Sequence, residues 1–188
     1  LIEEFMLLAN RRVAEYCAYR LSNGRRVARP MVFRVHDEPS EDKLERFREF
    51  ALRFGHYFKA QKGRAVAKEM NKLLSTISGR PEHNAITTLA VRSMAKAVYT
   101  TDNIGHYGLA FPYYTHFTSP IRRYPDMLVH RLLASYLAGA KSSDKKHLEQ
   151  LCVHSTEREI IASDAERASI KYKMAEFMKD RIGEEFEG

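Results

Sequence analysis

The sequence predicts a mainly α-helical fold with one or two short strands. Apolar residues recur with the period of an α-helix in several segments of the 188-residue chain, most clearly over 1–21 and 144–181. Glycine or proline stands near the ends of these segments, which is typical of helix boundaries. The short run from Met31 to Val35 has the character of a strand.

These patterns predict six helices. The first covers residues 1–21 and ends at Asn23-Gly24, and the second begins after Ser40 as its N-cap and ends at Gly55. The other four are expected over 64–77, from Pro81 to Val98, over 125–139 and from Asp144 to Arg181. Residues 101–118 are rich in glycine and aromatic residues without a clean period, so we expect an ordered irregular segment there.

Two of the predicted helices carry a long stripe that should be buried. In the first helix the stripe is apolar, and its members are Ile2, Phe5, Met6, Ala9, Val13, Tyr16 and Cys17. In the last helix the middle of the stripe consists of small residues, which would let another backbone approach; its members are Leu148, Leu151, Ser155, Ala162, Ala165, Ser169 and Tyr172.

Composition and charge limit the classes of protein. The net charge is +7, from 31 basic and 24 acidic residues. This excess favours an anionic partner, and a merely basic domain is an equally open reading. No apolar run reaches the ~18 residues that suggest a membrane span. Glu3 and Glu4 stand where a signal peptide would be basic. Leu1 is not a start methionine, so we expect the chain to be part of a longer protein.

The two cysteines, Cys17 and Cys152, each lie beside apolar residues and form no CxxC motif. We expect buried free thiols in a reducing compartment and no zinc site.

The segment from His106 to Asp126, HYGLAFPYYTHFTSPIRRYPD, carries most of the chemical information. Ser119-Pro120 is typical of a helix start, where free backbone N–H groups can receive a phosphate. Arg122 and Arg123 follow within one turn, and a guanidinium fork matches phosphate geometry. Pro125 then interrupts that turn, so the two arginines should lie on a short rigid elbow.

Aromatic side chains near these arginines could stack on unpaired bases; they are Tyr107, Phe111, Tyr113, Tyr114, Phe117 and Tyr124. The alternative is an aromatic core segment with two solvated arginines. We expect Asp126 to cap the following helix or to brace Arg122 or Arg123. His116 and His130 are interpreted as structural, because the histidines lack metal-binding spacing.

The stretch THFTSPIRRYPDMLVHR, residues 115–131, closely resembles the signature of the RNB family, the RNase II and RNase R exoribonucleases. LIEEFMLLAN at the start, FRVHDEPS at 33–40 (similar to the RNase R branch) and DAER at 164–167 resemble the same family. The resemblance implies that residues 1–181 are the helical C-terminal portion of an α/β catalytic domain. It also implies that 182–188 begin a linker to an S1-like RNA-binding domain absent from this chain.

The resemblance also implies an activity: processive 3′→5′ hydrolysis of single-stranded RNA to nucleoside 5′-monophosphates, with Mg²⁺ held by aspartates. Arg122 matches the arginine that grips the scissile phosphate and stabilises charge in the transition state. Glu3 matches a glutamate that contacts the sugar near the 3′ end, and Glu166 matches one near the terminal nucleotide. A monomeric cytoplasmic enzyme is implied, with no membrane and no DNA partner.

The other candidate RNA contacts are Asn10, Tyr114, Thr118, Ser119, Arg123 and Tyr124. Helix geometry puts Glu3 and Asn10 on nearly one line and Glu4 on the opposite side. Asn10 is therefore expected to orient Glu3 or close the pocket beside it, or else to satisfy nearby backbone groups. Glu166 has the alternative of an ordinary ion pair with Arg158 or Arg167.

The family's metal site uses clustered aspartates of the DxxxxxDxDD kind, and the seven aspartates of this chain are scattered. We therefore expect the Mg²⁺ ligands to lie outside the chain and the 188 residues alone to be inactive. The alternative function is a non-catalytic RNA-binding or scaffold homologue. A helix-turn-helix DNA-binding domain is disfavoured, because residues 127–137 are too apolar for a recognition helix.

Overall fold

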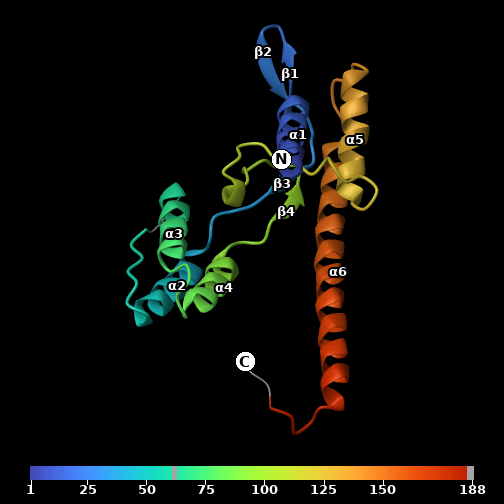
Figure 1. The fold of residues 1–188 in the computed structure, drawn as a ribbon. Coiled ribbons are helices and arrows are strands. Elements are labelled where there is room, and N and C mark those ends of the chain that lie inside the picture. The colour runs from blue at the N-terminus through green and yellow to red at the C-terminus, as the bar shows by residue number, and fades with distance from the viewer. Residues whose placement is uncertain (61–62, 186–188) are drawn as a thin grey trace.

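Helices make up most of the molecule, which is a computed structural model describing residues 1–60 and 63–185. The elements in chain order are α1 (Ile2–Ala18), β1 (Tyr19–Ser22), β2 (Arg25–Ala28), β3 (Phe33–Val35), α2 (Glu41–Arg53), α3 (Arg64–Thr76), α4 (His83–Ser93), β4 (Val98–Thr100), η1 (Tyr107–Leu109), α5 (Tyr124–Leu137) and α6 (Lys145–Lys179). The predicted mainly α-helical class is confirmed (Figure 1), and the short strands number four in the described residues.

The first helix ends at Ala18, not at residue 21 as predicted, and an antiparallel hairpin follows. Strands β1 and β2 pair from Tyr19 opposite Ala28 to Ser22 opposite Arg25. Asn23 has φ of 52° and Gly24 of 75°. Positive φ at both central residues is the requirement of a type I′ turn, the two-residue turn that suits twisted strands. Asn23-Gly24 is therefore a hairpin turn, and its interpretation as a helix end was wrong.

The first core gathers elements from both ends of the chain. Strand β3 pairs antiparallel with β4, Phe33 opposite Thr100, and confirms the predicted strand. The end of α1, α5 and the beginning of α6 pack around this pair (Figure 1). The buried members of this core are Cys17, Ala18, Met31, Val32, Phe33, Val35, Tyr99, Leu128, Val129, Leu132, Tyr136, Leu148 and Cys152. Both cysteines are buried and unpaired, as predicted.

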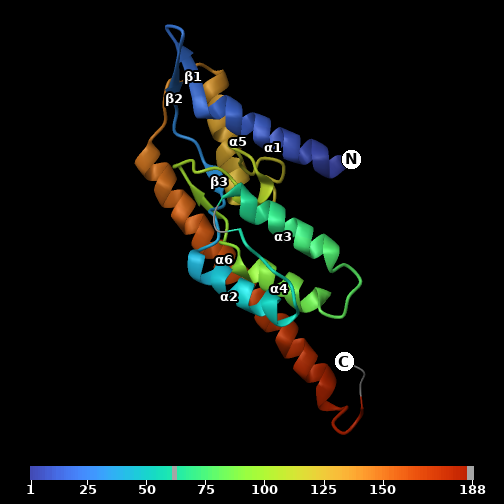
Figure 2. The ribbon, with the colours of Figure 1, turned by 90° about the vertical axis from the view of Figure 1, so that its left-hand side faces the viewer.

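The second core lies between α2, α3 and α4, which group together beside the first core (Figure 2). Ser40 occupies the predicted N-cap position of α2, although its carbonyl and not its side chain accepts from Lys43 and Leu44. Helix α3 matches its prediction closely. Helix α4 is shorter than predicted: it ends at Ser93, and Val98 pairs with Val35 in the sheet, where a β-branched residue packs well.

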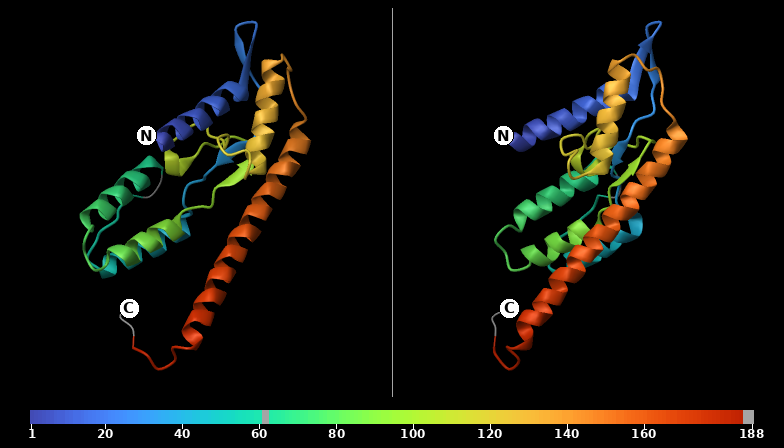
Figure 3. Two further views of the ribbon diagram at one scale, coloured as in Figure 1. Left: turned by 45° about the vertical axis from the view of Figure 1, so that its right-hand side comes forward. Right: turned by 90° about the vertical axis from the view of Figure 1, so that its right-hand side faces the viewer.

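The two predicted stripes are buried over only part of their length. In α1 the buried residues begin at Asn10, whereas Ile2 is 78% and Phe5 61% exposed. In α6 Leu148 and Cys152 are buried, whereas Ala162, Ala165, Ser169 and Tyr172 are exposed. The C-terminal end of α6 extends past the other helices (Figure 3), and no described residue covers it. Periodicity predicted both helices but overestimated how much of each is covered in this chain.

Two further sequence predictions concern the ends and the membrane. Helix α6 stops at Lys179, and Gly183 follows with φ of 97°. Residues 186–188 of the expected linker lie outside the described residues. In the part of the chain that the structure describes, no helix has both the length and the apolar content to cross a bilayer.

The second core should depend strongly on Phe47, which is 0% exposed and meets the ring of Phe58 edge-on at 5.2 Å. Phe47→Ala should lower the free energy of unfolding by about 3–5 kcal/mol through the cavity it leaves, measured by urea denaturation. Leu52→Ala is the matched control, because Leu52 lies on the same helix and is 52% exposed. Equal losses in the two variants would contradict this description of the core.

Candidate functional site

The predicted elbow is present as a single turn of backbone between Ser119 and Arg123. The Ser119 carbonyl accepts from the amides of Arg122 at 3.3 Å and Arg123 at 3.1 Å. The chain then becomes extended at Arg123, the N-cap residue of α5, and Pro125 lies in the first turn of that helix. A proline there needs no backbone donor, so the turn stops and a new helix starts.

The carboxylate of Asp126 holds this turn together. Asp126 is 0% exposed. Its Oδ1 accepts from the Ser119 amide at 2.8 Å and from Arg123 Nη2 at 2.9 Å, and its Oδ2 accepts from Arg123 Nε at 2.9 Å. A buried carboxylate is tolerated when it is paired and hydrogen-bonded in this way. Asp126 therefore braces Arg123, one of the roles expected for it.

The two neighbouring arginines differ in what they can bind. The Nε and Nη2 atoms of Arg123 are engaged by Asp126. Arg122 is exposed, and its side chain makes no hydrogen bond or ion pair with any residue that the structure describes. Tyr124, the next aromatic residue, is 43% exposed. The turn therefore offers one free guanidinium to an anion, beside an aromatic face.

Asn10 anchors the segment before the turn to α1. Its side chain is 4% exposed. The Oδ1 atom accepts from the amides of Phe117 at 3.0 Å and Thr118 at 3.2 Å, and Nδ2 donates to the Tyr114 hydroxyl at 3.2 Å. These hydrogen bonds satisfy nearby backbone amides, which is one of the roles considered for Asn10. The Thr118 hydroxyl is buried with no partner among the described residues.

Tyr114 is a support of the loop and does not present a free face. It is 6% exposed, and its ring meets those of His106 and His116 at centroid distances of 5.2 and 5.7 Å. The stacking surface expected at Tyr114 is therefore used inside the protein. Its burial follows from tertiary packing, which the local sequence could not distinguish from an exposed aromatic face.

The histidines near the turn have structural surroundings, as interpreted from the sequence. Burial, assisted by Arg123 and Arg34, lowers the pKa of His116 to about 3. Burial and the neighbouring His36 lower the pKa of His106 to about 4. Both are therefore neutral at pH 7, as expected for rings packed inside the protein. The ring of His130 stacks on Phe117 at 4.0 Å.

Glu3 and Glu166 are exposed and are not bonded to the turn in the described residues. Glu3 is exposed in the first turn of α1, about 10 Å along the helix axis from Asn10 at ~1.5 Å per residue. Glu166 is exposed on the uncovered half of α6, and Arg167 pairs with Asp164 at 3.5 Å instead. Within residues 1–60 and 63–185, no hydrogen bond or ion pair joins either glutamate to the turn.

The described residues do not fit a metal ion. Among them, no three His, Cys, Asp or Glu side chains gather closely enough to hold one. Asp126 is also unsuited to the task, because both its oxygens already accept from Ser119 and Arg123. We assign no chemical step in this chain to Mg²⁺.

Comparison with known proteins shows to which family the chain belongs. A family model described as the RNB domain matches residues 1–139. The chain belongs to the RNB family. Ribonuclease R 1 of Lactococcus lactis is 40% identical to this RNB chain over 194 residues, which include all of this chain and 23% of the relative. The chain thus spans about a quarter of the length of such relatives.

Solved structures share the fold of this RNB chain. The RNase R of Mycoplasma genitalium, in complex with ribose-methylated single-stranded RNA, superposes with a TM-score of 0.82 and 28% identity over 97% of this chain and 29% of its own. Yeast Ssd1, described as a pseudonuclease, superposes with a TM-score of 0.66 and 28% identity over 83% of this chain and 19% of its own.

Removal of the Asn10 side chain should loosen the segment before the turn. Asn10→Ala leaves the amides of Phe117 and Thr118 without their acceptor, so we expect a loss of about 2–3 kcal/mol of stability. Hydrogen exchange at these two amides should become faster. Asn10→Asp keeps an acceptor and should lose less. Unchanged exchange at both amides in Asn10→Ala would contradict the anchoring role.

Proposed function

We propose that this chain is part of a processive 3′→5′ exoribonuclease that hydrolyses single-stranded RNA to nucleoside 5′-monophosphates. The observation that carries the proposal is the free guanidinium of Arg122 on a turn fixed by Asp126 and Asn10. Membership of the RNB family and similarity to ribonucleases R support it. So does the single-stranded RNA held by the M. genitalium RNase R.

Arg122 would act on the scissile phosphate. Hydrolysis adds water to phosphorus and breaks the bond to the 3′ oxygen of the preceding nucleotide. Negative charge grows on the phosphoryl oxygens during this step, and a fixed cation beside them lowers the barrier. The guanidinium keeps its proton in proteins, so Arg122 serves as an electrostatic partner and not as an acid or base. Arg123, bound to Asp126, would position the turn.

The other candidate residues would form the wall around the last nucleotide. Glu3 is exposed and could accept hydrogen bonds from ribose hydroxyls. Tyr124 is the exposed aromatic side chain next to the arginines and could stack on a base. Ser119 and Thr118 would shape the turn through their backbone, and Glu166 would approach from α6. In this proposal the Mg²⁺ ligands of the complete enzyme lie outside this chain.

The second candidate is a non-catalytic RNA-binding or scaffold homologue. The similarity to yeast Ssd1 favours it, because that protein is described as a pseudonuclease and shares this fold. The sequence upstream of this chain in the longer gene separates the candidates: a cluster of aspartates supports the enzyme, and its absence supports the binder. We further propose a monomeric, cytoplasmic protein that binds RNA and not DNA.

In the longer protein, Arg122→Ala should reduce the rate of RNA hydrolysis by about 100–1000-fold, as expected for the loss of one fixed transition-state partner. Binding of single-stranded RNA should weaken much less. Single-turnover cleavage and equilibrium binding measure the two quantities. Arg46→Ala on α2, which also removes an exposed charge, should leave both near the original values. Equal losses of rate and affinity in Arg122→Ala would make Arg122 a general anchor.

The 188-residue chain alone should not hydrolyse RNA, because its described carboxylates form no metal site. The measurement is incubation of 3′-labelled single-stranded RNA with the purified chain and Mg²⁺, followed by separation of the products. The Arg122→Ala chain serves as the control for contaminating nuclease. Release of monophosphates that follows the chain through purification and disappears in Arg122→Ala would show that the chain is sufficient.

A further inference from the structure

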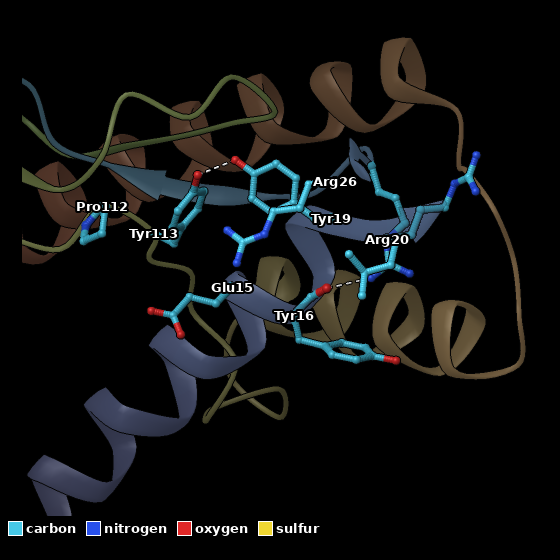
Figure 4. A pocket seen from close by; sticks show the side chains of 9 residues that line it. Glu15, Tyr16, Tyr19, Arg20, Arg26, Pro112 and Tyr113 are labelled. Carbon is cyan, nitrogen blue, oxygen red and sulfur yellow. Dashed lines mark hydrogen bonds between the residues drawn. The ribbon is translucent and has the colours of Figure 1, made fainter. Parts of the chain in front are cut away.

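A cleft of about 690 Å³ lies at the base of the β1–β2 hairpin, away from the turn that carries Arg122. It is bounded by the C-terminal end of α1, the hairpin strands and the loop at Pro112-Tyr113 (Figure 4). We call it the hairpin cleft. Its size is within the range of sites that bind small organic groups. The side chains that matter here are Tyr16, Tyr19, Arg20, Arg26 and Tyr113.

The hairpin cleft is electropositive. Arg20 and Arg26 have no ion pair with any residue that the structure describes. Among the described residues lining the cleft, Glu15 supplies the one carboxylate, and its two oxygens accept from Arg11 and Arg12, each at 2.9 Å. The positive charge of the cleft is therefore not neutralised within the described chain, and an anion would find uncommitted guanidinium groups there.

Aromatic rings with fixed orientation line the same cleft. Tyr19 and Tyr113 meet edge-on, with ring centroids 5.7 Å apart and planes at 79°, and their hydroxyls are hydrogen-bonded to each other (Figure 4). Arg26 lies over the Tyr19 ring at 5.9 Å. The two share a face of the hairpin, because Arg26 pairs with Leu21 across the strands, and Leu21 and Tyr19 are two residues apart on β1. Tyr16 is 48% exposed at the end of α1. A guanidinium can bind the phosphate of a nucleotide, and an aromatic ring nearby can stack on its base.

We propose that the hairpin cleft is a second RNA-binding site, which takes one nucleotide unit of a single strand. Its phosphate would pair with Arg26, and its base would stack on Tyr16 or Tyr19. Arg20 lies on the opposite face of the hairpin and would add only longer-range positive charge. An acidic peptide would use the arginines but leave the ring faces unused, so the cleft favours RNA. This site goes beyond the proposed function, because it neither contains nor contacts Arg122.

The cleft is separated along α1 from Glu3, the residue that would contact the last nucleotide in the proposed function. Tyr16 follows Glu3 by thirteen residues, which is about 20 Å of helix at ~1.5 Å per residue. Asn10, which anchors the segment before the turn, lies between them. A strand held in the hairpin cleft would therefore contact the protein well away from its 3′ end.

There is a simpler explanation for the arginines. Charged residues on exposed strands prevent edge-to-edge pairing with other chains, and a two-stranded hairpin on its own contributes little stability. If this is their role, their removal should affect RNA binding no more than removal of other exposed charges. The tyrosines would then have no effect at all.

The test measures binding of a short fluorescent single-stranded RNA to the 188-residue chain by anisotropy. Arg20→Gln/Arg26→Gln should weaken binding about 10-fold and reduce the salt dependence. The control, Lys72→Gln/Arg92→Gln, removes two exposed charges from α3 and α4 and should change affinity about 3-fold or less by loss of net charge. Equal effects of the two double variants would overturn the proposal. Circular dichroism checks that each variant is folded.

The contribution of the rings is tested separately. Tyr16→Ala should weaken binding by about 5-fold or more if a base stacks there, and a competitor strand of sugar and phosphate without bases should compete poorly. Equal competition by the strand without bases or by poly-glutamate would each overturn the proposed strand site.

Ultraviolet crosslinking of RNA that contains 4-thiouridine locates the contact. Adducts at Tyr16, Tyr19 or Tyr113 are expected in the original chain and equally in Arg122→Ala, which separates this inference from the proposed function. Adducts confined to the Ser119–Tyr124 region would support the proposed function and overturn the hairpin cleft as an RNA-binding site.

Discussion

The buried carboxylate of Asp126 is the constraint on which the geometry of the candidate site depends. Transfer of an ion from water into the protein costs several kcal/mol unless strong partners replace the water. Here the partners are the guanidinium of Arg123 and the amide of Ser119, at opposite ends of one turn. Because a single side chain requires both, the intervening residues have little freedom. The position of Arg122 is therefore fixed by the neighbouring Arg123, whose charge is paired with Asp126.

A second polar anchor gives that turn a place in the molecule. Asn10 lies on the buried side of α1, and its side chain binds two successive amides of the loop and the hydroxyl of Tyr114. The first core then fixes α1 and α5 against the β3–β4 pair. The chain of support runs from apolar packing, through two buried polar groups, to one exposed cation. Fixed placement of this kind is what makes an electrostatic partner effective in catalysis.

The sequence predicted the helices and the elbow because both are encoded locally. Apolar periodicity and capping residues placed α2 and α3 nearly to the residue, and Pro125 ended the turn as expected. The misses are tertiary. Asn23-Gly24 suits either a helix end or a hairpin turn, and the pairing of Tyr19 with Ala28 decides it. Burial of Tyr114 and pairing of Val98 with Val35 depend on residues distant in sequence. An asparagine on the apolar face of α1 was the available signal for the loop anchor.

Helix α6 is held at one end only, and the rest of it projects from the described residues. Its contacts with the sheet are concentrated near its beginning: Glu149 accepts from Thr101, Thr156 accepts from the Tyr99 amide, and Glu159 forms a bidentate pair with Arg34. From Glu159 to Lys179 the helix continues for about 30 Å at ~1.5 Å per residue. A tilt of a few degrees at the base therefore displaces the tip by roughly 2 Å over that length. The position of this tip is therefore set at the other end of the helix, by these polar contacts and by the packing of Leu148 and Cys152 in the first core.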